Sequence, residues 1–208
     1  MVLNFKNVIE KYGVDLKNVI HVGGHHGHEV SLYKETNPEC KVILFEPHPD
    51  TFKIMCDNVK KYDDVRCLNV ALGGPETSSG VMYTEVANGG QSNSLLKPAL
   101  HASQYPHIVF NSTVEVYVHT LDSYQLDETF NFLSMDVQGY ELEVLKGATK
   151  TLNHVDAIIA EINNAELYTG CCMVNELDEF LEKYGFVRVE SDWIGGTWGD
   201  GLYIKNKS

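Results

Sequence analysis

Short apolar segments recur along the chain, and this recurrence restricts the fold more than any other feature of the sequence. Each segment is rich in Val, Ile, Leu or Phe and ends near a polar or glycine-rich turn. Strands that are buried on both faces of a parallel sheet have this character. The segments cover residues 18–22, 41–46, 65–71, 130–136 and 156–162.

Segments with helical spacing separate these predicted strands. Residues 28–36 and 49–61 carry apolar side chains three and four positions apart, and the second begins with a proline, which suits a first helical turn. Residues 139–152 place Leu142, Leu145 and Leu152 on one stripe of a helix. The alternation of strands and helices predicts a doubly wound α/β sheet.

The C-terminal part changes pattern. A helix is predicted over residues 174–185, with Gly185 as its stop. The segments 186–191 and 201–206 are predicted to pair as an antiparallel hairpin around a loop at 192–200. The chain therefore adds a hairpin after its parallel strands.

Residues 73–113 do not follow this scheme. The segment is rich in Gly, Ser and Asn, contains one predicted strand at 80–86, and is longer than an ordinary connector. We interpret it as an insertion that serves as a lid or a substrate-binding segment. Because no repeat or linker divides the chain, residues 1–208 are predicted to form a single domain.

Charge and apolar patterning restrict the class of partner. The chain has 16 basic and 29 acidic residues and a formal net charge of -13, a field that repels nucleic acids. It contains no apolar run long enough for a membrane span, and its opening MVLNFKNVIEKYG carries charges, unlike a signal peptide. The sequence predicts a cytoplasmic protein with neither a nucleic-acid substrate nor a membrane span.

The cysteines predict reduced thiols. There are five of them without CxxC spacing, which is typical of neither a disulfide framework nor a zinc site. The adjacent Cys171 and Cys172 leave a redox role open.

The stretch IHVGGHHGHE at residues 20–29 follows the first predicted strand. Its glycines would let the backbone approach a ligand and expose amides at a helix start, or would serve packing alone. The stretch is neither a G-x-x-x-x-G-K-[ST] phosphate loop nor a G-x-G-x-x-G dinucleotide fingerprint. Zinc is not favoured, because His25, His26 and His28 point in different directions at the start of a helix.

A carboxylate ends the second predicted strand. Glu46 lies 23 residues beyond Gly23, where an acidic side chain can accept both hydroxyls of a ribose. The glycine turn and the strand-end acid together indicate a nucleoside cofactor without a pyrophosphate. A nicotinamide-dependent oxidoreductase is the alternative enzyme class.

Seven blocks of the sequence, in this order, resemble the FkbM family of S-adenosylmethionine-dependent O-methyltransferases, in its branch with an I-H-V-G-A-H opening. The blocks are IHVGGHHGHE, FEPHPDTF, LNVALG, GGQSNSLL, LSMDVQGYELEVLKGA, EINNAELYTGC and TWGDGLYI. The resemblance runs from about residue 18 to the C-terminus. It implies a class I methyltransferase fold, a Rossmann-like seven-stranded and mostly parallel sheet with helices on both faces and an antiparallel last strand.

The resemblance also implies roles for residues at matching positions. The glycine turn would line the methionine end of S-adenosylmethionine, Glu46 would bind its ribose, and Asp136 with Gln138 would lie beside the sulfonium. The implied cofactor-binding residues are His21, Gly23, Gly24, Gly27, Glu46, Pro47, Asn69 or Ala71 beside the adenine, Asp136 and Gln138. This chain departs from the family at three of its motif positions, with His21 for aspartate, Gly24 for alanine and Tyr140 for alanine.

Methyl transfer from a sulfonium to oxygen requires alignment of donor and acceptor and removal of a proton. Asp136, His25 and His26 are the candidate bases. Asp136 has two alternative roles, as the N-cap of a helix that starts at Gly139 and as a ligand of Mg²⁺ or Ca²⁺ together with Glu161 and Asn163.

Amide, hydroxyl, imidazole and aromatic side chains form the candidate acceptor site. Such groups suit an uncharged, polyhydroxylated acceptor, such as a sugar in a glycan or in a glycosylated small molecule. A polar lid that only excludes water, a non-sugar natural product as acceptor, and a catalytically silent cofactor-binding module are the alternatives. The candidate residues are Gln91, Ser92, Ser94, Tyr105, His107, Asn163, Tyr168 and Trp198.

Overall fold

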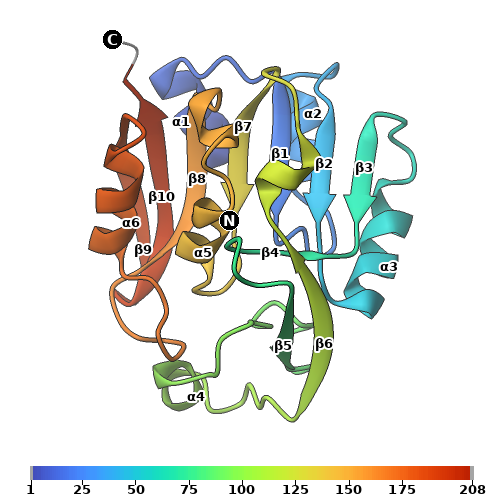
Figure 1. The fold of residues 1–208 in the computed structure, drawn as a ribbon, viewed down its shortest axis with the longest axis vertical. Coiled ribbons are helices and arrows are strands. Elements are labelled where there is room, and N and C mark those ends of the chain that lie inside the picture. Colours follow the sequence, from blue (N-terminus) through green and yellow to red (C-terminus); the bar gives the residue numbers. More distant parts are fainter. Residues whose placement is uncertain (1, 207–208) are drawn as a thin grey trace.

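A seven-stranded sheet forms the centre of the molecule (Figure 1), which a computed structural model describes over residues 2–206. The strand order is β3-β2-β1-β7-β8-β10-β9, and β10 runs opposite to the other six strands. The prediction of a mostly parallel sheet with an antiparallel last strand is therefore confirmed. The strands are β1 (Asn18–Val22), β2 (Val42–Phe45), β3 (Val65–Leu68), β7 (Phe130–Met135), β8 (Ala157–Asn163), β9 (Phe186–Ile194) and β10 (Trp198–Lys205).

Helices cover both faces of this sheet. On one face Val19, Leu44 and Phe132 pack against α1 (Phe5–Tyr12), α2 (Val30–Thr36) and α3 (Pro49–Val59). On the other face alternate strand residues such as Ile20 and Leu133 pack against α5 (Glu141–Lys146) and α6 (Val174–Glu182). Burial on both faces explains why the central strands read as continuous apolar runs.

Helix α1 was not among the sequence predictions. Asn4 caps its start by accepting a hydrogen bond from the Asn7 amide, and Gly13 ends it in a left-handed conformation. Its apolar side chains Phe5, Val8 and Ile9 are buried against the sheet. The charged residues that distinguish this segment from a signal peptide lie on the outer side of an amphipathic helix.

Several predicted boundaries were wrong. The strand predicted at 65–71 ends at Leu68, because Asn69 turns to donate to the backbone oxygens of Glu46 and Pro47. The helix predicted at 139–152 contains only α5 and, beyond Gly147, a separate 3₁₀ turn, η2 (Thr151–Asn153). The loop predicted at 192–200 is mostly strand, since β9 and β10 are joined by residues 195–197 alone.

The segment 73–113 contributes to a second, three-stranded sheet of order β4-β6-β5, whose strand β4 precedes the segment and whose strand β6 begins at its end. The elements of this region are β4 (Ala71–Leu72), β5 (Ser79–Thr84), α4 (Leu100–Gln104) and β6 (Ser112–His119), and a 3₁₀ turn, η1 (Leu121–Tyr124), follows. The predicted strand at 80–86 corresponds to β5, whereas β6 was not predicted. Figure 1 shows β5, β6 and α4 beyond the carboxyl ends of β1, β2 and β3.

No helix within residues 2–206 is long and apolar enough to cross a membrane.

Candidate active site

A cavity of about 540 Å³ lies at the carboxyl ends of the central strands, where ligands bind in open α/β sheets. One side is lined by the turns after β1 and β2, the other by β7, β8 and β10, and the segment between β5 and α4 adds further lining residues. The predicted site residues that line it are His21, Gly23, His25, His26, Glu46, Pro47, Ala71, Gln91, Ser92, Tyr105, Asp136, Gln138 and Trp198.

The three glycines of the first turn have different surroundings. Gly23 lines the cavity with φ +80°, and a Cβ there would lie 1.9 Å from the backbone oxygen of Asp136. A Cβ at Gly24 would instead meet Met55 Sδ at 2.7 Å, and one at Gly27 would meet Val59 Cγ1 at 2.8 Å. Gly24 and Gly27 therefore let α3 pack closely against the turn, while Gly23 brings the ends of β1 and β7 together.

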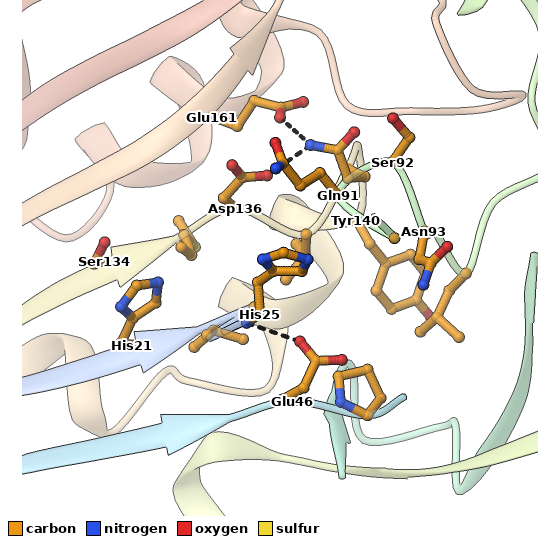
Figure 2. A pocket seen from close by; sticks show the side chains of 18 of the residues that line it. His21, His25, Glu46, Gln91, Ser92, Asn93, Ser134, Asp136, Tyr140 and Glu161 are labelled. Carbon is orange, nitrogen blue, oxygen red and sulfur yellow. Dashed lines mark hydrogen bonds between the residues drawn. The ribbon is translucent and has the colours of Figure 1, made fainter. Parts of the chain in front are cut away.

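Glu46 lies just after β2 and is held in place through both carboxylate oxygens. Oε2 accepts from the His25 amide at 2.9 Å, and Oε1 accepts from the His48 amide at 2.8 Å. Its side chain points into the cavity (Figure 2). Burial raises the pKa of Glu46 to about 7, against the two amide hydrogen bonds that lower it. The carboxylate keeps further lone pairs for a ligand's hydroxyls.

The two candidates for the adenine side lie differently. Ala71 lines the cavity together with Val70 and Leu72. Asn69 does not line it, because its amide ties the backbone of residues 46 and 47. Asn69 thus shapes the turn that carries Glu46.

His21 occupies the end of β1 as a buried residue, and its Nδ1 lies 3.0 Å from the Tyr33 hydroxyl. Desolvation lowers the pKa of His21, although Glu29 and Asp136 oppose the shift. His21 is therefore a neutral side chain of the cavity wall at neutral pH.

Asp136 and Glu161 point toward one another across a single amide (Figure 2). Gln138 Nε2 donates to Asp136 Oδ1 at 2.7 Å and to Glu161 Oε2 at 2.6 Å. Gln138 adopts a left-handed conformation with φ +56°, which turns its side chain back toward the end of β7. The predicted capping role of Asp136 was wrong, because Tyr140 is the N-cap of α5 and makes no side-chain cap bond.

The imidazoles of His25 and His26 stack with a centroid distance of 3.8 Å. His25 Nε2 also lies 2.9 Å from the backbone oxygen of Gly89, so this ring connects the first turn to the segment between β5 and α4. Burial lowers the pKa of His26.

Within residues 2–206, no group of three or more His, Cys, Asp and Glu side chains is arranged to hold a metal ion.

The candidate acceptor residues fall into two groups. Gln91, Ser92, Tyr105 and Trp198 line the cavity, and Trp198 Nε1 donates to the Tyr105 hydroxyl at 2.8 Å. The other four candidates, Ser94, His107, Asn163 and Tyr168, do not line it.

Three of those four support the cavity wall. Ser94 donates to the Gln138 backbone oxygen at 2.8 Å, and the Tyr168 hydroxyl lies 2.7 Å from Gln138 Oε1. Asn163 Nδ2 contacts Glu161 Oε1 at 3.3 Å. His107 is exposed at the surface.

Sequence reasoning missed other members of the cavity wall. Asp200 on β10 is paired in register with Glu161 on β8 and accepts from the backbone amides of Val2 and Leu3. His101 and Ile108 contribute from α4 and the loop after it. Asp200 lies in the block TWGDGLYI, but its position opposite Glu161 depends on the pairing of β8 with β10, which the predicted loop at 192–200 did not include.

The strand order, the antiparallel β10 and a cavity between a glycine turn and a strand-end carboxylate define a class I methyltransferase fold. The chain belongs to the FkbM methyltransferase family, because the family's domain model, Methyltransferase FkbM domain, matches residues 21–188.

Named relatives and solved structures agree with this assignment. The chain is 25% identical over 199 residues to 2-O-methyltransferase NoeI of Sinorhizobium fredii, which covers 91% of this chain and 79% of that protein. It is 28% identical over 130 residues to hexuronic acid methyltransferase AglP of Haloferax volcanii, covering 60% and 48% of the two chains.

Two solved structures share the fold. A SAM-dependent methyltransferase from Aquifex aeolicus matches 98% of this chain and 90% of its own with TM-score 0.51 and 14% identity. Precorrin-6y C5,15-methyltransferase from Geobacter metallireducens matches 96% and 86% with TM-score 0.53 and 11% identity.

Proposed function

We propose that this protein transfers a methyl group from S-adenosylmethionine to a hydroxyl of a sugar, in a glycan or in a glycosylated small molecule. The observation that carries the proposal is one continuous cavity with two chemically different sides. Glu46 and the turn after β1 form one side, Tyr105 and Trp198 form part of the other, and Asp136 lies at the carboxyl end of β7.

The side formed by β1, β2 and β4 fits the nucleoside end of the cofactor. Glu46 would accept hydrogen bonds from the ribose hydroxyls, and Pro47 and Ala71 offer apolar contacts for the base. Gly23 leaves room for the chain of the methionine. The bound cofactor supplies an electrophilic methyl group on a sulfonium.

The other side fits an uncharged, hydroxylated acceptor. Gln91 and Ser92 offer amide and hydroxyl groups, and Tyr105 and Trp198 offer aromatic surface on which a sugar ring can lie. Among residues 2–206, those lining the cavity include no Lys or Arg. They do include the acids Glu29, Glu46, Asp136, Glu161 and Asp200.

This charge pattern favours a neutral sugar over a hexuronate. A carboxylate on the acceptor would enter a cavity rich in acids without a Lys or Arg partner among residues 2–206, and that arrangement is costly. NoeI is named a 2-O-methyltransferase and AglP a hexuronic acid methyltransferase. The first name supports methylation on oxygen and the second supports a sugar acceptor, while the cavity residues of this chain support a neutral one.

Asp136 is the proposed base. It lies at the end of β7, and Gln138 fixes one carboxylate oxygen, which leaves the group oriented toward the cavity. The acceptor oxygen attacks the methyl carbon, the carbon–sulfur bond breaks toward sulfur, and the hydroxyl proton passes to Asp136. His25 and His26 would form the wall between the first turn and the insertion.

The segment 73–113 would act as the substrate-binding insertion of a single domain. It brings Gln91, Ser92 and Tyr105 to the cavity, and Ser94 and the Gly89 backbone connect it to Gln138 and His25. These contacts would exclude water from the reacting groups.

Mass spectrometry of reaction products tests the proposal. The protein is incubated with S-adenosylmethionine and matched oligosaccharides that end in a neutral hexose or in a hexuronate, with Asp136→Asn as control. The neutral sugar should gain one methyl group on oxygen, and Asp136→Asn should lower kcat by about 100-fold or more. Methylation of the hexuronate alone would contradict the neutral acceptor, and methylation on nitrogen or carbon would contradict O-methylation.

A further inference from the structure

Glu161 is a buried acid in the cavity to which the proposed reaction gives no role. Its side chain is 2% exposed, at the point where β8 passes the end of β7. Gln138 Nε2 contacts one oxygen of Glu161 and one oxygen of Asp136, so the two carboxyl groups are immediate neighbours. Figure 2 shows both side chains directed to this shared nitrogen.

The ionisable groups packed around this pair include further acids and no Lys or Arg among the described residues that line the cavity. Glu141 on α5 and Asp200 on β10 are the other carboxyl groups nearby, and His21 on β1 and Tyr168 face the pair as uncharged groups. Two carboxylates this close, without a cation between them, do not both ionise easily. One proton shared between them relieves the repulsion, as in other enzymes that place two acids side by side.

Burial favours the proton on Glu161. Burial and the charges of Asp136 and Glu141 raise the pKa of Glu161 well above its usual range. Asp136 is the more open of the two at the cavity surface, where the acceptor would approach.

Gln138 is held in place by the segment between β5 and α4 and by the loop after β8. The Tyr168 hydroxyl lies 2.7 Å from Gln138 Oε1 and 3.0 Å from the Ser92 backbone oxygen, and the Ser94 hydroxyl donates to the Gln138 backbone oxygen. Tyr168 and Ser94 are both fully buried. The amide that joins the two acids is therefore fixed from the acceptor side of the site.

We propose that Asp136 and Glu161 act as one pair with a single proton between them: Asp136 accepts the proton of the acceptor hydroxyl, and protonated Glu161 is the hydrogen-bond donor that keeps Asp136 oriented. Gln138 is the positioning residue of this pair. The catalytic role of this pair rests on the proposed methyl transfer, whereas the shared proton does not. In that step the acceptor oxygen forms a bond to the methyl carbon, the carbon–sulfur electrons stay on sulfur, the released proton ends on Asp136, and the proton of Glu161 does not leave.

Infrared spectroscopy of the protein at neutral pH tests the protonation state without any acceptor. A protonated carboxyl has a C=O stretch that a carboxylate lacks. The difference spectrum of wild type minus Glu161→Gln should contain this band, and the matched difference for Glu179→Gln, an exposed acid on α6, should not. If Glu161→Gln removes only carboxylate bands, the shared proton is refuted, whatever the enzyme methylates.

Kinetics test the division of roles. Glutamine has the shape and neutral charge of a protonated glutamate and can donate a hydrogen bond, so Glu161→Gln should keep kcat within about 10-fold of wild type, whereas Asp136→Asn should lower it by about 100-fold or more. Glu161→Leu, which cannot donate, should lower kcat and shift the acidic limb of its pH profile while cofactor affinity is unchanged. A Glu161→Gln variant as impaired as Asp136→Asn would show that Glu161 works ionised and would overturn the proposal. If the wild type methylates no sugar, the proposed function fails, and the infrared result alone decides whether Asp136 and Glu161 share a proton.

Discussion

At the scale of single residues, Glu46 and Asp136 are the two acids to which the proposed function assigns the cofactor side and the acceptor side of the cavity. Both follow parallel strands at the same edge of the sheet, but their environments differ. Glu46 is held by two backbone amides, whereas Asp136 is held by the side chain of Gln138. The first arrangement suits a fixed acceptor of hydrogen bonds, and the second suits a group whose charge changes during reaction.

Glu46→Gln should weaken binding of S-adenosylhomocysteine by about 10- to 100-fold, because an amide cannot accept hydrogen bonds at both ends as the carboxylate does. Calorimetric titration measures the effect, with Glu179→Gln as the matched control on the exposed side of α6. An affinity equal to that of wild type would exclude the ribose-binding role.

Glu46 should also make the free energy of unfolding depend on pH. Burial raises the pKa of Glu46 from 4.5 to about 7, so the unfolded chain releases this proton at lower pH than the folded protein does. The free energy of unfolding should therefore lose about 3 kcal/mol from this group as pH rises from below 4.5 to above 7. Urea unfolding of wild type and Glu46→Gln at both ends of this range isolates the contribution, since Glu46→Gln should lack it. Equal pH slopes in the two proteins would contradict this account.

At the scale of elements, helix α3 and the first glycine turn are packed too closely for a side chain between them. Gly24→Ala should lower the free energy of unfolding by about 1–3 kcal/mol, because its Cβ would overlap Met55 Sδ. Combining it with Met55→Ala should cost less than the sum of the two single changes, since the smaller side chain removes the overlap. Additive losses in urea unfolding would show that Met55 is not the cause.

The contact between α4 and β10 is predicted to serve acceptor binding. Tyr105 follows α4, and its hydroxyl accepts from Trp198 Nε1 and lies 3.1 Å from Gln104 Nε2. Tyr105→Phe should raise the acceptor KM about 3- to 10-fold and leave cofactor affinity unchanged, because it frees the indole and removes one hydroxyl. His107→Ala, at an exposed site outside the cavity, is the control. A loss of cofactor affinity in Tyr105→Phe would contradict this prediction and assign the contact to the cofactor side of the cavity.

The strands of the main sheet were predictable where burial on both faces leaves a local pattern. Segments such as 18–22 and 156–162 are apolar because each of their faces packs against helices, and that requirement is visible without a partner. The sequence of β6 carries the alternation of a half-buried strand, so this strand was predictable as well. The end of β3 depended on the Asn69 side chain and could not be read from propensity.

The site was predictable only in part, because some of its contacts join distant segments. Glu46 was recognised since a strand-end acid has a known use. The roles of Gly24 and Gly27 depend on Met55 and Val59, so the packing alternative could not be separated from cofactor binding in the sequence. The sequence placed Glu161 near Asp136 as a candidate metal ligand, but the amide that joins the two acids depends on the left-handed conformation of Gln138.

At the scale of the whole molecule, the side chains that line the cavity lie at one edge of the main sheet. The parallel strands direct their carboxyl ends to the cavity, and antiparallel β10 adds Trp198 and Asp200 from its amino-terminal half. Strands β5 and β6 and helix α4 lie beyond this edge (Figure 1). A nucleoside side and an acceptor side can thus meet at the end of β7 within a chain of 208 residues.

The measurement that tests this account most directly is calorimetric titration of the protein with S-adenosylmethionine and S-adenosylhomocysteine, with NAD as control. We expect micromolar binding of both sulfur cofactors and no binding of NAD, because Glu46 fits a ribose while the first turn lacks the dinucleotide fingerprint. Binding of NAD without binding of either sulfur cofactor would contradict the proposed methyl transfer.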